Sequence, residues 1–171
     1  MSFRNSLKHY IEDDHSRLEN HPKMTLYSSG TISEREFVEI LTILSSFWHS
    51  ACPDNNVLPQ EYRSFLSEYR AALSVDIGCP AGVRHSFQKE YDEVAFFYLL
   101  LGSSHGARFM LKKLASTHLP ISHIKILSER GPKLWKPFID DYLETVNTDR
   151  RLLVRESAKR IFTDLHLCLS Y

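Results

Sequence analysis

The stretch VAFFYLLLGSSHGARFMLKK, residues Val94 to Lys113, decides the fold. Its apolar part is too short to span a bilayer and has charged residues on both sides, so it is predicted to form the central, buried helix of a helical protein. Gly102 and Gly106 lie inside it, although each glycine costs a helix about 1 kcal/mol relative to Ala. Their spacing puts both on one face, so we expect a close helix or flat ligand there, or a bend.

Helical spacing of apolar residues recurs along the rest of the chain, and no convincing stretch alternates with a period of two. We therefore predict an all-α, compact bundle of six to eight helices in a single domain covering residues 1–171. Ser33 and Glu36 have the spacing of a capping box at a helix start. Residues 51–58 are predicted as a loop, 78–82 as a turn, and Gly131-Pro132 as a break between two helices.

The charge balance and the cysteines exclude several classes of protein. Lys plus Arg and Asp plus Glu number 21 each, so bulk charge favours neither nucleic acid nor an anionic membrane. The first residues, MSFRNSLKHYIEDD, lack the apolar core of a signal peptide, and we expect a cytoplasmic location without a membrane. The three cysteines are widely spaced and form no CxxC pair, so the sequence suggests neither a disulfide framework nor a zinc site. Nucleotide, flavin and serine-hydrolase fingerprints are missing from the sequence.

The first predicted helix, from about Ser6 to Asn20, carries polar residues at helical spacing. Lys8 and His15 are seven residues apart, almost two whole turns, and Glu19 follows His15 by one turn. These side chains therefore share one face. Alone, the pattern is also that of an ordinary solvated helix surface.

Several segments in order resemble the heme oxygenase family, especially its short bacterial members. They are Leu7-Lys8, His15 followed by Glu19, LLLGSSHGARFMLKKL on the central helix, and LWKPF at 134–138. The likeness extends over nearly the whole chain. It implies a heme oxygenase-like fold and the oxidation of heme by O2 to biliverdin, CO and Fe2+.

The resemblance assigns a role to each candidate residue. His15 corresponds to the axial ligand, and Glu19 would orient its imidazole. Lys8 and Lys136 match positions that approach the heme propionates, and Phe97 aligns where some relatives have a propionate-contacting Tyr. On the opposite side of the heme, Gly102 and Gly106 would bring bare backbone to the ring, and Ser103 with water would deliver protons. His105 would donate a hydrogen bond to O2, coordinate as a sixth ligand, or face away. Ala107 replaces a usual second glycine.

The implied reaction needs electrons from another protein. A ferredoxin or flavoprotein reductase is expected to dock near Arg108, Lys112, Lys113 and Lys133, and a phytochrome is one candidate acceptor of biliverdin. Two alternatives stay open at this stage: a heme carrier or storage protein of the same fold without turnover, and a heme-free helical interaction protein.

Overall fold

Eight α-helices form in the computed structural model within the residues that it describes, 2–54, 57–79 and 88–171. The predicted all-α class is confirmed. The helices are α1 (Phe3–Tyr10), α2 (Glu12–Glu19), α3 (Pro22–Tyr27), α4 (Glu34–Ser50), α5 (Gln60–Asp76), α6 (Glu93–Leu114), α7 (Ser122–Phe138) and α8 (Thr148–Ser170). A turn of π-helix, η1 (Ile139–Leu143), follows α7, and two short strands, β1 (Ala51–Pro53) and β2 (Lys89–Tyr91), join the helices.

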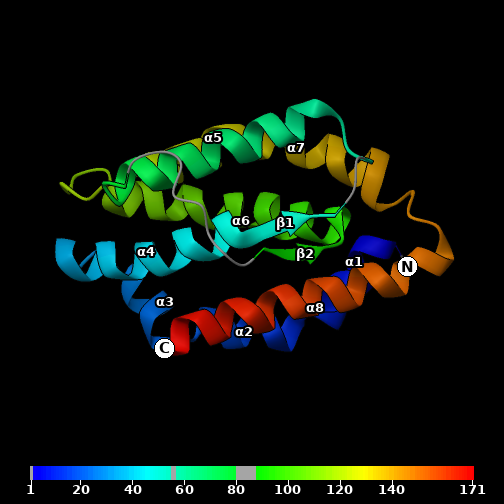
Figure 1. Ribbon diagram of the computed structural model, residues 1–171, viewed down its shortest axis with the longest axis horizontal. Helices are drawn as coiled ribbons and strands as arrows, with labels where there is room; N and C mark the ends of the chain where they lie inside the picture. The colour runs from blue at the N-terminus through cyan, green and yellow to red at the C-terminus, as the bar shows by residue number, and fades with distance from the viewer. Residues whose placement is uncertain (1, 55–56, 80–87) are drawn as a thin grey trace.

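The central helix α6 begins and ends within one residue of the prediction. It runs through the middle of the molecule, with α5 and α7 above it and α4 and α8 below it in the view of Figure 1. Asp92 starts the helix, because its carboxylate accepts hydrogen bonds from the backbone N–H groups of Val94 and Ala95, at 2.9 and 3.1 Å. Arg150 of α8 donates two hydrogen bonds to the other oxygen of this buried carboxylate, at 3.0 and 2.8 Å.

By length and composition alone, α6 would also suit a membrane span. It has 22 residues, and the mean hydropathy of its most apolar 18-residue window is 1.2. Among the described residues it is the one helix that meets this criterion. In the structure its first turns are buried against neighbouring helices, and their side chains belong to the hydrophobic core. This packing is the arrangement that a core helix adopts.

The predicted break at Gly131-Pro132 is wrong, because α7 continues through both residues. A proline inside a helix removes one backbone hydrogen bond, and tertiary packing has to compensate for it. Gly131 provides that packing: a Cβ atom built there would lie 2.5 Å from Cβ of Ser104 on α6. The glycine therefore permits a close crossing of α6 and α7. The chain leaves regular α-helix later, at η1, directly after Phe138.

The predicted first helix is divided into two. Ile11 has φ −103° and ψ 6°, which interrupts the helical backbone between α1 and α2. Far along the chain, Glu144 stabilises the start of α1, since its two carboxylate oxygens accept the N–H groups of Phe3 and Arg4 at 2.8 and 2.9 Å. The break at Ile11 lets the N-terminal segment follow the surface of the bundle.

The segment predicted as a loop at 51–58 contains β1, which pairs in parallel with β2. Ala51 lies opposite Lys89, Cys52 opposite Glu90 and Pro53 opposite Tyr91. Of the predicted turn at 78–82, Gly78 has a positive φ of 68°, which glycine adopts readily, and residues 80–82 lie outside the described residues. The predicted capping box of Ser33 and Glu36 is confirmed at the start of α4.

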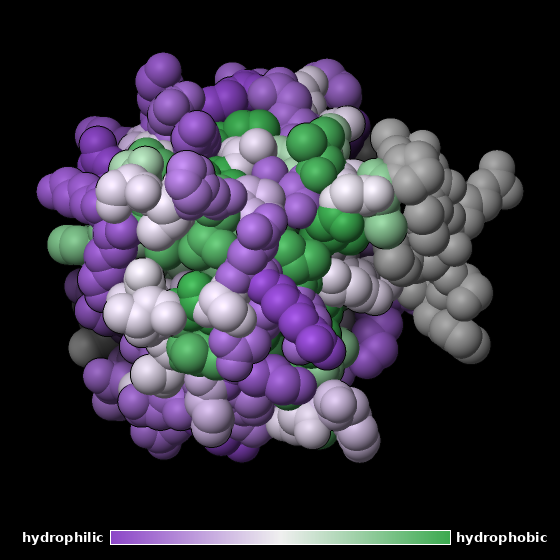
Figure 2. Space-filling view, turned by 90° about the vertical axis from the view of Figure 1, so that its left-hand side faces the viewer, coloured by the Kyte–Doolittle hydropathy of each residue, from purple (hydrophilic) through white to green (hydrophobic). Residues whose placement is uncertain are grey.

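A buried chain of polar side chains joins three helices at one end of the bundle. The backbone N–H and Nδ1 of His123 donate to Oδ2 of Asp76, at 2.8 and 2.6 Å, and the hydroxyl of Tyr27 donates to Nε2 of the same ring. These groups belong to α7, α5 and α3. Figure 2 looks onto this end, where apolar side chains show at the centre among polar ones.

Candidate functional site

The two glycines predicted to leave α6 bare have different surroundings. A Cβ atom at Gly106 would meet nothing within 4 Å, whereas one at Gly102 would lie 3.8 Å from the indole of Trp135 on α7. Phe109, one turn after Gly106, keeps 70% of its surface exposed. The face of α6 around Gly106 is therefore uncovered backbone beside an exposed aromatic ring, and the close helix contact occurs elsewhere, at Gly131.

The N-terminal segment approaches the Gly102 and Gly106 face of α6 at two points. At one end, the guanidinium of Arg4 on α1 lies 5.5 Å from the centre of the Trp135 ring, which covers Gly102. At the other end, a Cβ at Gly30, after α3, would lie 3.5 Å from Cβ of Lys113, near the end of α6. Between these two points in the chain, α2 packs against α8. Figure 1 shows α1, α2 and α3 following one another from right to left below α6.

His15 lies in the middle of α2, and its side chain is 53% exposed. Its Nδ1 is 3.4 Å from Oε2 of Glu19, one turn later, so the two side chains meet as the spacing predicted. The edge of the imidazole contacts Phe162 of α8, with the ring centres 5.6 Å apart. A proton on Nδ1 directed at this carboxylate leaves the lone pair of Nε2 available as a ligand.

Ser103 and His105 lie on the exposed side of α6, and both are engaged within the protein. The Ser103 hydroxyl donates to the carbonyl of Leu100 at 2.6 Å. Nδ1 of His105 is 3.2 Å from the carbonyl oxygen of Gly102, and its ring meets Trp135 edge-on at 5.4 Å between centres. In the structure, the His105 ring therefore packs against Trp135 of α7.

The two lysines predicted near the propionates are both exposed. Lys8 lies on the surface of α1. Lys136 forms an ion pair with Asp140, one turn further along the chain, and this hydrogen bond raises the pKa of Lys136. A ligand carboxylate would have to compete with Asp140 for Lys136.

Phe97 lies away from the uncovered face of α6. It is fully buried and contacts Phe96 and Tyr62, with ring centres 5.3 and 5.7 Å apart. Nine residues, or two and a half turns, separate it from Gly106, so it is on the opposite side of the helix. A ligand on the Gly106 face would not reach Phe97. Ala107 is likewise buried, so its methyl group points into the core and does not narrow this face.

Tyr98 is the neighbouring aromatic residue that shares a face with Gly102. It lies one turn before Gly102, and its ring centre is 5.7 Å from that of Trp135. Burial raises the pKa of Tyr98, and the nearby guanidinium of Arg4 lowers it by less. The i,i+4 spacing alone places Tyr98 and Gly102 on one face of the helix.

Further residues of this region were missed from the sequence. Phe109 could have been found, because it follows Gly106 by three residues on one helix face. Arg4, Trp135 and Phe162 come from other helices, and no local spacing connects them with the glycines. Their contribution depends on how α1, α7 and α8 pack against the site.

The donor set of the site is one imidazole. Among the described residues, no group of three His, Cys, Asp or Glu side chains is placed to hold a metal ion. A single imidazole suits a ligand that carries its own metal and other donors, as a metalloporphyrin does. No family model, curated protein or solved structure matches this chain.

Proposed function

We propose that the chain binds heme between α2 and the Gly106 face of α6, and that it oxidises heme to biliverdin, CO and Fe2+ with O2 and electrons from a reductase. Two observations carry the proposal: an imidazole on α2 that is oriented by a carboxylate, and uncovered backbone on α6. His15 has its Nδ1 beside Glu19, and Gly106 has no atom within 4 Å of its Cβ position. The resemblance of the ordered segments to heme oxygenases supports the same assignment.

The residues present fit the two faces of a porphyrin. Nε2 of His15 would bind the iron, and the Glu19 carboxylate would hold the imidazole in the required tautomer. Gly106 would let the α6 backbone approach the ring, and Phe109 would cover part of its apolar edge. Bound heme would supply the iron that activates O2 and the ring that is oxidised. The protein's contribution is to position the ring and to limit the groups that reach it.

Cations at the edge of the site would neutralise the propionates. Lys8 is exposed on α1. Arg4, on the same helix, stacks on Trp135 beside Gly102 and is the cation that the sequence interpretation missed. Lys136 contributes only if its ion pair with Asp140 opens. We therefore rank Arg4 and Lys8 ahead of Lys136 as propionate partners.

Protons and electrons would arrive by separate routes. Ser103 would have to turn its hydroxyl away from the Leu100 carbonyl to hold water at the face of the ring. Arg108, Lys112 and Lys113 lie exposed on the last turns of α6, and Lys133 is exposed on α7. These cations would provide the basic surface on which a ferredoxin or flavoprotein reductase docks. A phytochrome remains our candidate acceptor of biliverdin.

A hemin titration followed by aerobic turnover tests the proposal. Wild-type protein is expected to give a Soret band, and His15→Ala is expected to weaken binding and shift that band. His9→Ala is the matched control, because His9 is also a helix-surface histidine with its Nδ1 3.4 Å from a carboxylate, that of Glu12. Equal behaviour of the two variants would remove His15 as the ligand.

Addition of a reductase or ascorbate under air then separates the enzyme from a carrier. Loss of the Soret band with a new absorbance in the red is expected for biliverdin formation. A heme carrier is the second candidate, because the Ser103 hydroxyl is tied to its own helix and the His105 ring rests on Trp135. A stable Soret band under these conditions would assign the carrier function, and no spectral change with hemin would reject both.

A further inference from the structure

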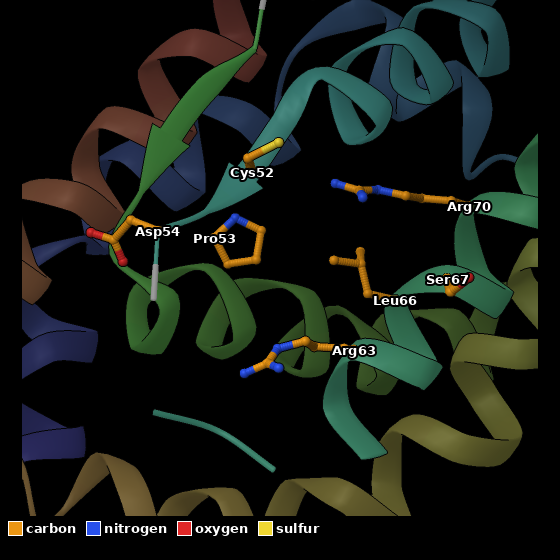
Figure 3. A pocket seen from close by; sticks show the side chains of 7 residues that line it. All are labelled: Cys52, Pro53, Asp54, Arg63, Leu66, Ser67 and Arg70. Carbon is orange, nitrogen blue, oxygen red and sulfur yellow. The ribbon is translucent and has the colours of Figure 1, made fainter. Parts of the chain in front are cut away.

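A cavity of about 370 Å³ lies between β1 and α5, apart from the residues of the heme proposal. It is lined by Cys52, Pro53, Asp54, Arg63, Leu66, Ser67 and Arg70 (Figure 3). Its size is at the lower end of the range for small-molecule sites. The chemistry of its walls indicates what it would bind.

Arg70 brings a partly buried positive charge to this cavity. Its Nε donates to the carbonyl of Trp48 at 2.8 Å, and its Nη2 donates to the carbonyl of Ala51, so the side chain caps the end of α4. A guanidinium has five N–H donors, and Nη1 is not used by these bonds. Burial lowers the pKa of Arg70, and contact with the Cys52 side chain raises it by less. No carboxylate oxygen of the described residues lies within 4 Å of this guanidinium, so its charge has no counter-ion there.

Arg63 supplies a second positive charge from the same face of α5, two turns earlier. Its Nη2 donates to the carbonyl of Leu58 at 3.2 Å and lies 3.9 Å from Oε1 of Glu93. That Glu93 oxygen is buried without a hydrogen bond among the described residues, and its partner oxygen accepts two backbone N–H groups. At 3.9 Å, the contact between Arg63 and Glu93 is longer than a hydrogen bond. Arg63 therefore keeps N–H donors for a ligand.

The two guanidinium groups lie on either side of an apolar strip. Figure 3 shows Arg63 and Arg70 reaching from α5 toward β1, with Leu66 between them and Pro53 facing them. Seven residues of helix set their Cα atoms about 10 Å apart. The carboxylate of Asp54, which accepts the N–H of Glu93 at 3.1 Å, points away from both cations in the same view.

We propose that this cavity binds a small organic dianion, with one acidic group on Arg70, the other on Arg63, and an apolar spacer over Pro53 and Leu66. A guanidinium pairs well with carboxylate or phosphate groups, and an acid at Arg70 supplies the missing counter-charge. The proposal does not rest on heme binding, because the two sites share no residue.

Straight-chain dicarboxylates of increasing length, from succinate to azelate, test the proposal by calorimetric titration of the wild-type protein. Binding is expected to pass through an optimum at the length that spans both cations, and monocarboxylates of equal length are expected to bind at least about tenfold more weakly. Arg63→Met is expected to remove this preference, while the surface variant Arg35→Met retains it. Equal binding of mono- and dicarboxylates, or no binding of either, would overturn the proposal.

Alkylation of the cysteines locates the bound acid. Cys52 lines the cavity, and Cys79 and Cys168 are exposed elsewhere, so they serve as internal controls. The best dicarboxylate should slow alkylation by neutral iodoacetamide at Cys52 alone, as measured by mass spectrometry. Equal protection of all three cysteines, or of none, would place the acid outside the cavity. This measurement needs no substitution, so it holds even if Arg63→Met fails to fold.

Discussion

Replacing Gly106 by Ala should affect stability and heme binding in opposite directions. The added methyl group would meet no atom within 4 Å, so the structure predicts no steric cost in the free protein. Ala is favoured over Gly inside a helix by about 1 kcal/mol. For a chain of this size that corresponds to a rise of roughly 2–4 °C in the melting temperature.

The same methyl group would project into the proposed heme site. It extends about 1.5 Å beyond Cα, whereas a ring packed on bare backbone is already at van der Waals distance. The heme would have to move outward or the helix would have to shift, at a cost of about 1–3 kcal/mol. We therefore expect hemin affinity to fall about 5- to 150-fold.

Thermal unfolding of the free protein and a hemin titration, followed at the Soret band, measure the two effects. A variant that melts higher than wild type and binds hemin more weakly would agree with both parts of the reasoning. Unchanged hemin affinity in a variant of raised stability would refute the assignment of the Gly106 face as the heme surface. A lowered melting temperature would contradict the first part of the reasoning, that the added methyl group meets no other atom in the free protein.

Three further predictions concern the packing of the bundle. Gly131→Ala should lower the free energy of unfolding by about 1–3 kcal/mol, because the added Cβ would lie 2.5 Å from Cβ of Ser104. In a double-mutant cycle measured by chemical denaturation, adding Ser104→Gly should restore part of this loss. Burial raises the pKa of Asp76, but hydrogen bonds from His123 lower it by more, so the pKa lies below the ordinary 3.8. The Asp76 carboxylate therefore stabilises the fold above its unfolded pKa and loses this effect as the pH falls through the native value, and Asp76→Asn should flatten the dependence of the melting temperature on pH below about 5. Tyr27→Phe should cost about 1–2 kcal/mol in urea unfolding, because Nε2 of His123 loses its buried partner; an unchanged midpoint would contradict this.

Local patterns in the chain were sufficient for the helices and some of their contacts. The apolar run at 94–113, the capping residues Ser33 and Glu36, and the meeting of His15 with Glu19 all depend on residues within a turn or two of one another. Hydrogen bonds within a helix and side chains at i,i+4 form between near neighbours, so spacing alone predicts them.

Partners distant in the sequence depended on the tertiary structure. The sequence does not distinguish the surroundings of the three glycines at 102, 106 and 131. In the structure, Gly102 faces Trp135, Gly106 faces open space and Gly131 lies against Ser104. The continuity of α7 through Pro132 and the pairing of β1 with β2 follow from neighbours far along the chain. A helix of this composition can pack through more than one face, and complementary shapes on the other helices select the face that is buried.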